Sequence, residues 1–188
     1  MIYYFYGVSM IYKFKDKTPD VSKAAFVADS ADIIGEVTLG EDSSIWFNTV
    51  LRGDIAPVIV GKGSNIQEGT VVHVENDTPC IIGDNVIVGH GAILHATKIG
   101  SRSLIGMGAI VLSNSEIGED SVVGAGSLVT EGKKFPAKSL IIGSPARRIR
   151  EVSDSEMERI KRGAEKYIGL GKELSGTDAT IQRNDRMS

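Results

Sequence analysis

Residues 99–129 of the chain read IGSRSLIGMGAIVLSNSEIGEDSVVGAGSLV, and this stretch determines the fold. An aliphatic residue recurs at every sixth position, and four of the six are followed by glycine: Ile99, Ile105, Val111, Ile117, Val123 and Val129. A period of six matches neither the helical repeat of about 3.6 residues nor the simple alternation of a strand. The stretch therefore predicts a solenoid in which each hexad forms a short strand and a turn.

The same phase runs through the earlier part of the chain, at Val27, Ile33, Leu39, Ile45, Leu51, Val60, Ile66, Val72, Ile82, Val88 and Leu94. We expect these anchor residues to point into the core, and three hexads to close a triangular coil of about eighteen residues. The pattern resembles the hexapeptide-repeat family, whose members are left-handed parallel β-helices. The fold class implied is an all-β solenoid, and its handedness rests on the resemblance because spacing alone does not define it.

The six-residue period is interrupted at three places. Three residues are inserted within 51–60, four within 72–82, and one residue is missing within 94–99. Insertions in a solenoid are expected to form loops on one face, where they often build a site. The histidines of the chain lie beside these breaks.

The sequence divides into an N-terminal segment (1–17), the β-helix (18–146), a C-terminal helix (147–174) packed along it, and a flexible polar tail (175–188). The helix is predicted from the capping box of Ser153 and Glu156. Its apolar face would carry Met157, Ile160, Ala164, Tyr167 and Ile168. For the first nine residues two interpretations stay open: either translation starts at Met10, or residues 1–9 add an edge strand.

Composition limits the partners and the compartment. With 188 residues, 41% of them hydrophobic, one main domain is expected, and a net charge of −3 argues against nucleic acid as a partner. Cys80 is the only cysteine, so no intrachain disulfide is possible and a cytoplasmic location fits best. The first twelve residues are apolar but have no basic region and are shorter than the roughly 20 residues of a membrane span. We therefore expect no membrane association.

The three histidines of the chain all fall between residues 73 and 95. His73 and His95 directly follow equivalent anchors one coil apart, so they should stack about 5 Å apart on one face, within reach of one ion. His90 lies five residues before His95, roughly 16 Å away along the strand direction. If the three act together, His90 must come from a neighbouring copy, and a homotrimer is the simplest closed arrangement. The alternative is that each histidine is an ordinary turn or surface residue.

Three neutral imidazoles with an open fourth position are typical of a catalytic zinc site. Zn2+ in such a site activates water at neutral pH. Fe2+ or Co2+ accept the same ligands, so the identity of the metal stays open. No organic cofactor site is expected.

Two segments, SSIWFNTVLRGDIAPVIVGKGSNIQEGTVVH (residues 43–73) and VGHGAILH (88–95), closely resemble the gamma-class carbonic anhydrase family. The resemblance covers roughly residues 18–170. Members of that family are trimers that hold zinc, or sometimes iron or cobalt, between subunits, and they catalyse the reversible hydration of carbon dioxide to bicarbonate. The resemblance implies that His73, His90 and His95 are the metal ligands.

The resemblance also implies roles for other residues. Arg52 and Asp54 match the interfacial ion pair of the family, which is the favoured interpretation; the alternative is a surface salt bridge. Gln67 matches the residue that orients the hydroxide nucleophile, and Asn65 matches a polar group on the substrate side; the alternative is a structural amide ladder. Tyr167 resembles the helix tyrosine that approaches the site, but it could also serve only in helix packing.

The sequence departs from the fast enzymes of this class at their proton-exporting carboxylates. Ile55 stands where the active type has glutamate, and the loop after His73 is short and lacks a long acidic excursion. We expect Glu75, or alternatively Asp77, to carry the proton, and weak or absent activity stays open. Two other functions are compatible with the pattern: a hexapeptide-repeat acyltransferase that uses coenzyme A and needs a metal-free histidine as general base, and a non-enzymatic, metal-stabilised trimeric scaffold.

Overall fold

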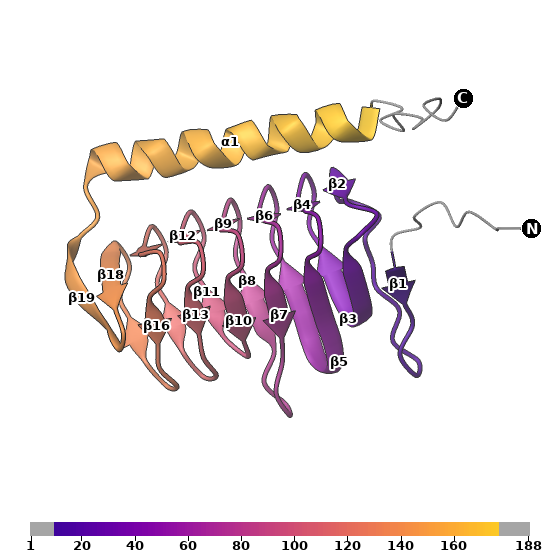
Figure 1. The fold of residues 1–188 in the computed structure, drawn as a ribbon, viewed down its shortest axis with the longest axis horizontal. Helices are drawn as coiled ribbons and strands as arrows, with labels where there is room; N and C mark the ends of the chain where they lie inside the picture. The colour runs from indigo at the N-terminus through magenta and orange to yellow at the C-terminus, as the bar shows by residue number, and fades with distance from the viewer. Residues whose placement is uncertain (1–9, 177–188) are drawn as a thin grey trace, which may run out of the picture.

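The computed structural model describes residues 10–176 and is a triangular prism of stacked coils with one helix along its side (Figure 1). Each coil contributes one short strand to each of three faces, and the strands of successive coils pair in parallel. The structure confirms the expected fold class, a left-handed parallel β-helix of hexapeptide repeats. All of the predicted anchors are buried except Val27, which is partly buried.

The first face, here called the covered face, lies under the helix. Its strands are β2 (Phe26–Val27), β4 (Ser44–Ile45), β6 (Asn65–Ile66), β9 (Ile87–Val88), β12 (Leu104–Ile105), β15 (Val122–Val123) and β18 (Ser139–Gly143). The helix α1 (Asp154–Gly176) packs on this face through Ile160, Ala164 and Gly171, which are buried. Of the apolar face predicted for the helix, Met157, Tyr167 and Ile168 are only half-buried.

The second face, here called the open face, has no helix over it among the described residues. It is formed by the first parts of β3 (Asp32–Leu39) and β5 (Val50–Val60) and by β7 (Val71–His73), β10 (Ile93–His95), β13 (Ile110–Val111) and β16 (Leu128–Val129). The outward-facing residues before each anchor form one apolar column: Val50, Val71, Ile93, Ile110 and Leu128. The third face contains the last part of β5 with β8 (Cys80–Ile82), β11 (Lys98–Ile99), β14 (Glu116–Ile117) and β17 (Lys134–Phe135).

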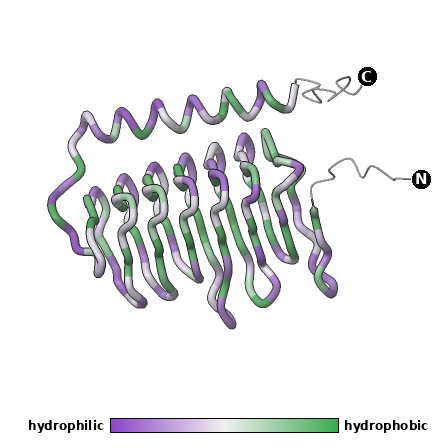
Figure 2. Tube along the Cα trace, in the orientation of Figure 1, coloured by the Kyte–Doolittle hydropathy of each residue, from purple (hydrophilic) through white to green (hydrophobic). Residues whose placement is uncertain are grey.

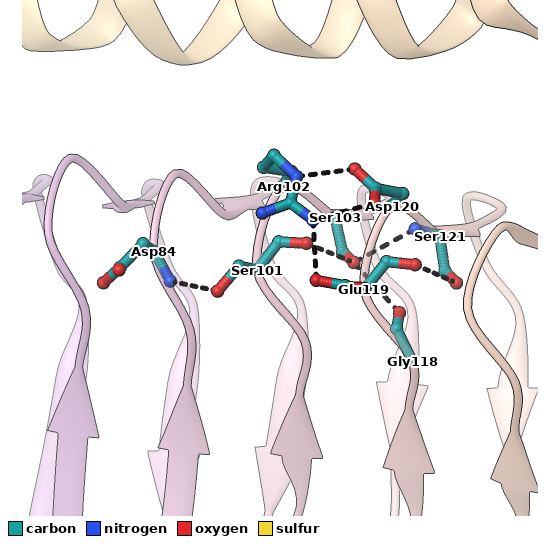
Figure 3. Close-up of polar contacts among 8 residues, drawn as sticks. All are labelled: Asp84, Ser101, Arg102, Ser103, Gly118, Glu119, Asp120 and Ser121. Atoms are coloured by element: carbon teal, nitrogen blue, oxygen red, sulfur yellow. Dashed lines mark hydrogen bonds and ion pairs between the residues drawn. The ribbon is translucent and has the colours of Figure 1, made fainter.

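Hydrophobic and hydrophilic segments alternate along every coil and along α1 (Figure 2). At the corner between the third face and the covered face, polar side chains join successive coils (Figure 3). Arg102 Nε lies 2.7 Å from Asp120 Oδ1, and the Ser103 hydroxyl accepts a hydrogen bond of 3.1 Å from the Ser121 backbone nitrogen. These contacts satisfy turn groups that would otherwise be left unpaired near the core.

The first insertion does not form a loop, contrary to the expectation from the sequence. Residues 50–60 are one continuous strand, β5, which pairs with β3 (Asp32–Leu39) across a register shift between Gly35 and Val37. A Cβ atom on Gly53 would lie 2.4 Å from the Glu36 carbonyl oxygen, so only glycine fits between Arg52 and Asp54. The extra residues are absorbed because two long strands cross the corner together.

The second insertion does form a loop, which extends beyond the neighbouring turns between β7 and β8 (Figure 1). Glu75 and Thr78 exchange backbone hydrogen bonds of 3.2 and 3.0 Å across it. Where one residue is missing, Ala96 turns the corner with a φ of 46°. Both features lie directly after a histidine, at the edge of the open face.

The C-terminal helix begins later than the predicted boundary. Residues 147–151 are not helical: β19 (Ala146–Glu151) pairs antiparallel with β18 and supplies a partner for the last strand of the covered face. The helix begins at Asp154, after a capping box in which the Ser153 backbone nitrogen donates to Glu156 Oε2 at 2.9 Å. It includes Ser175 and Gly176, and the rest of the predicted tail lies outside the described residues.

At the other end, β1 (Met10–Tyr12) pairs in parallel with β3, while residues 1–9, including the edge strand considered for them, lie outside the described part of the chain. The one helix within residues 10–176 has no apolar stretch long enough to cross a membrane.

Candidate metal centre

His73 and His95 lie side by side on the open face. They occupy directly paired positions of β7 and β10, and their ring centroids are 5.1 Å apart. His73 Nδ1 faces His95 Nε2 at 3.2 Å. The repeat places both residues immediately after an anchor, so both rings point outward at the edge of the same face.

Each ring is held by a second contact on its other nitrogen. His73 Nε2 lies 3.2 Å from Asp54 Oδ1, and His95 Nδ1 lies 2.8 Å from Ser113 Oγ. Asp54 also pairs with Arg52 of the same chain. Contacts of this kind orient imidazoles and determine which nitrogen is available as a ligand.

Burial and hydrogen bonding set the charges in this cluster. Burial lowers the pKa of His73, and this effect outweighs the opposing influence of Asp54. Burial acts to raise the pKa of Asp54, but hydrogen bonds from His73 and Arg52 outweigh it and hold the pKa below its ordinary value. A neutral imidazole beside an ionised carboxylate is the combination that binds a divalent cation.

His90 occupies a different place, in the turn between β9 and β10 at the opposite edge of the open face. Its Nδ1 lies 2.6 Å from Glu68 Oε2, close enough for an ion pair although the atoms are not aligned as a hydrogen bond. Within residues 10–176 of one chain, no three His, Cys, Asp or Glu side chains gather closely enough to hold a metal. One chain thus brings two of the three predicted ligands together and sets the third apart.

The pair formed by His73 and His95 has the geometry of a zinc site. With Zn–N distances of 2.0–2.1 Å, two ligand nitrogens of a tetrahedral ion are about 3.3 Å apart. The observed separation of 3.2 Å between His73 Nδ1 and His95 Nε2 agrees with this value. Because the outer nitrogens are engaged by Asp54 and Ser113, the two inner nitrogens, which contact each other in this structure, are the ones available to a cation. The residues present therefore fit the metal that the sequence predicts.

Gln67 and Asn65 form a buried amide pair at the end of β6. Gln67 Nε2 donates a hydrogen bond of 3.0 Å to Asn65 Oδ1. Asn65 is 1% exposed, and its Nδ2 has no hydrogen-bond partner among the described residues. Gln67 directly precedes Glu68, so this pair lies next to the His90 side of the molecule, and the unpartnered Nδ2 of Asn65 is buried.

Tyr167 lies on α1 and packs edge to face against Trp46, with ring centroids 5.3 Å apart. Burial raises the pKa of its phenol, and the negative charge of Glu68 adds to this shift. Tyr167 thus makes the helix-packing contact that was the alternative to a role at the site. Glu75 is exposed in the loop after β7, and no side-chain ion pair or hydrogen bond is formed by it within residues 10–176.

Two residues of the site were not singled out from the sequence. Glu68 occupies the position one coil before His90, and Ser113 lies eighteen residues, one regular coil, after His95. Both residues could have been found from the sequence by looking one coil before or after each histidine for a carboxylate or a hydroxyl, because such groups orient imidazole ligands.

The fold and the site together define a hexapeptide-repeat β-helix with stacked imidazoles at one edge of an open face and a third at the opposite edge. The family model described as bacterial transferase hexapeptide (six repeats) matches residues 96–131. A carbonic anhydrase of Geobacillus kaustophilus is 45% identical over 163 residues, which are 87% of this chain and 90% of that protein. A probable carbonic anhydrase of Methanocaldococcus jannaschii is 46% identical over 154 residues, 82% of this chain and 97% of that protein.

Among solved structures, a hexapeptide transferase family protein from Anaplasma phagocytophilum superimposes with a TM-score of 0.83 at 39% identity, covering 88% of this chain and 98% of that one. The chain belongs to the gamma-class carbonic anhydrase-like family of hexapeptide-repeat proteins.

Proposed function

We propose that this protein is a metal-dependent carbonic anhydrase that catalyses the reversible hydration of carbon dioxide to bicarbonate. A divalent cation, Zn2+ or alternatively Fe2+ or Co2+, would be held by His73 and His95 of one subunit and by His90 of the next. The observation that carries the proposal is the 3.2 Å separation of His73 Nδ1 and His95 Nε2. That distance fits two ligands of one ion, and a coordination sphere with only two protein ligands needs at least one more from elsewhere.

The open face supports a homotrimer. Val71 and Ile93 are each 39% exposed in its apolar column, and Phe47 and Met107 are exposed on the corner that carries His90. Contiguous apolar exposure of this kind is typical of a subunit contact. Since the two parts of the site lie at opposite edges of the same face, a threefold arrangement of open faces joins them around a closed ring.

Each polar residue of the site then has a defined task. Asp54 orients His73, and Glu68 holds His90. Three imidazoles on a zinc-type cation supply activated water at neutral pH. The amide pair of Gln67 and Asn65 provides hydrogen-bonding groups for the nucleophile and the substrate, and Glu75 provides a carboxylate in the exposed loop through which a proton can leave.

The test is stopped-flow hydration of carbon dioxide by protein whose metal content has been measured. We expect metal-dependent activity in the wild type, and a loss of about 100-fold or more in His90→Ala together with loss of bound metal. Lys98→Ala, an exposed residue on the third face, is the matched control and should retain both properties. Activity that is unchanged in His90→Ala would remove the catalytic proposal.

The same preparation separates the two alternatives. Acetyl transfer from acetyl-coenzyme A by the metal-free protein would favour an acyltransferase. An acyltransferase needs a histidine that is free of metal to act as general base, whereas the proposed site uses His73, His90 and His95 as ligands. If removal of the metal causes the oligomer to dissociate, and the metal-loaded protein had no hydration activity, the scaffold function is favoured instead.

A further inference from the structure

The imidazole of His95 is held by a hydroxyl group, whereas that of His73 is held by a carboxylate. Ser113 is 8% exposed and lies on the next coil, with Oγ 2.8 Å from His95 Nδ1. An ionised carboxylate only accepts hydrogen bonds, whereas a hydroxyl can donate or accept. The two histidines of the pair are therefore constrained in different ways.

The proton positions in the metal-free chain follow from Asp54. Because the carboxylate of Asp54 accepts, His73 must carry its proton on Nε2, and its Nδ1 carries a lone pair. His95 Nε2 faces that lone pair at 3.2 Å, so it must be the protonated nitrogen and donate to His73. His95 Nδ1 is then unprotonated and accepts a hydrogen bond from the hydroxyl of Ser113.

A bound cation reverses this arrangement at His95 but not at His73. Both inner nitrogens must then present lone pairs to the ion, so the proton of His95 has to reside on Nδ1. Ser113 Oγ must accept that hydrogen bond instead of donating one. A hydroxyl makes this change by rotating its own hydrogen, with no movement of heavy atoms.

We propose that Ser113 is a positioning residue that sets the tautomer of His95, donating to Nδ1 in the metal-free chain and accepting from Nδ1 when a divalent cation is bound. The inference rests on the metal site of the proposed function. It implies that the two histidines are hydrogen-bonded to each other when no metal is present, and that metal binding requires a change of tautomer at His95.

The direct test is nitrogen NMR of the three histidine side chains at about pH 8, where imidazoles are neutral. In metal-free wild type we expect His95 to be protonated at Nε2, and after addition of Zn2+ at Nδ1, while His73 stays protonated at Nε2. A His95 protonated at Nδ1 in both states would overturn the proposal. This measurement involves no carbon dioxide, so it can fail or succeed independently of the proposed activity.

Variants supply a second test through the affinity for Zn2+, measured by competition with a chelator. We expect Ser113→Ala to weaken binding by about 10–100-fold and Ser113→Thr, which keeps the hydroxyl, to restore it. Ser113→Asp should bind more tightly than wild type, because a carboxylate enforces the ligand tautomer. Ser115→Ala is the matched control at the same corner, since its hydroxyl contacts Leu112 and Thr97 but no histidine.

Wild-type affinity in Ser113→Ala, or an equal loss in Ser115→Ala, would overturn the role of Ser113. If Ser113→Ala does not fold, the NMR comparison of the wild type in its two states decides the question.

Discussion

The covered face and the open face have the same hexad pattern but different surroundings. Ile87 and Ile93 belong to the same coil, six residues apart, and both precede an anchor and point outward. Ile87 is 7% exposed because α1 lies on it, whereas Ile93 is 39% exposed. The difference teaches that an outward apolar column is buried only where a second element lies on it: α1 covers the column of the covered face, and the column of the open face is the surface that we propose for the subunit contact.

The largest effect should come from placing a charge on the covered face. Ile87→Asp would bury a carboxylate without a partner beneath Ile160 and Ala164. We expect the free energy of unfolding to fall by about 3 kcal/mol or more, with α1 released from the prism. Urea unfolding followed by circular dichroism measures this change, and a stability within about 0.5 kcal/mol of the wild type would show that the helix does not depend on this contact.

The matched change on the open face should act on assembly instead of folding. Ile93→Asp should alter the stability of a single chain by about 1 kcal/mol or less, but place a repelling charge three times around the axis of the proposed trimer. Sedimentation velocity should show the mass fall from three chains to one while the circular dichroism spectrum is retained. An unchanged mass would mean that the open face is not the subunit contact.

Glycine-to-alanine changes in α1 should have a smaller effect on stability, and they test how closely the helix packs on the covered face. Gly169 lies within α1, and a Cβ atom added there meets nothing within 4 Å. Gly169→Ala should therefore stabilise the protein by about 1 kcal/mol through helix propensity, measured as a shift in urea midpoint. In Gly163→Ala the new Cβ would lie 2.9 Å from Ile87 Cδ1, so a smaller gain is expected there. Equal gains at both sites would show that the helix is not tightly seated on Ile87.

The smallest effect concerns the capping box that starts α1. The guanidinium of Arg150 and the backbone and hydroxyl groups of Ser153 hold the pKa of Glu156 far below its ordinary value of 4.5. A lowered pKa in the folded chain contributes stability that is complete above the unfolded value and disappears as the pH falls below it. Glu156→Gln should thus be less stable than wild type at pH 7, and the difference should shrink below about pH 4.5. Thermal unfolding across pH 3–7 measures this, and a difference independent of pH would contradict it.

Much of the fold was predictable because burial of the anchor residues repeats with a fixed period. The stacking of His73 on His95 followed from the same period, since both residues come one position after an anchor. The list of anchors read from the sequence ended at Val129, but Phe135 and Ile141 continue the period within the predicted β-helix, as a further coil. Aromatic and proline residues in that coil make the six-residue period harder to recognise in the sequence, but the same positions of each hexad still face inward.

The remaining errors arose where pairing between strands overrides local pattern. Residues 147–151 contain three arginines and no alternation typical of a strand, yet β18 offers them a row of backbone partners. The insertion around Gly53 looks like a loop, but β3 holds it extended. At the site, Glu68 and Ser113 were missed because each contacts a histidine one coil away, and such contacts appear only after the coils are placed in register.

The path of α1 has a consequence for the size of the molecule. The helix returns from the last coil to the first, where Lys172 Nζ lies 2.8 Å from Asp42 Oδ1 and Ser175 bonds to the Ala25 carbonyl. Its 23 residues span about 35 Å, slightly more than the roughly 29 Å occupied by the seven strands of the covered face. The length of the helix therefore matches the length of the stack of coils. Duplication of one coil, the usual way in which repeat proteins lengthen, would need about three matching helical residues, so the number of coils and the length of the helix must change together.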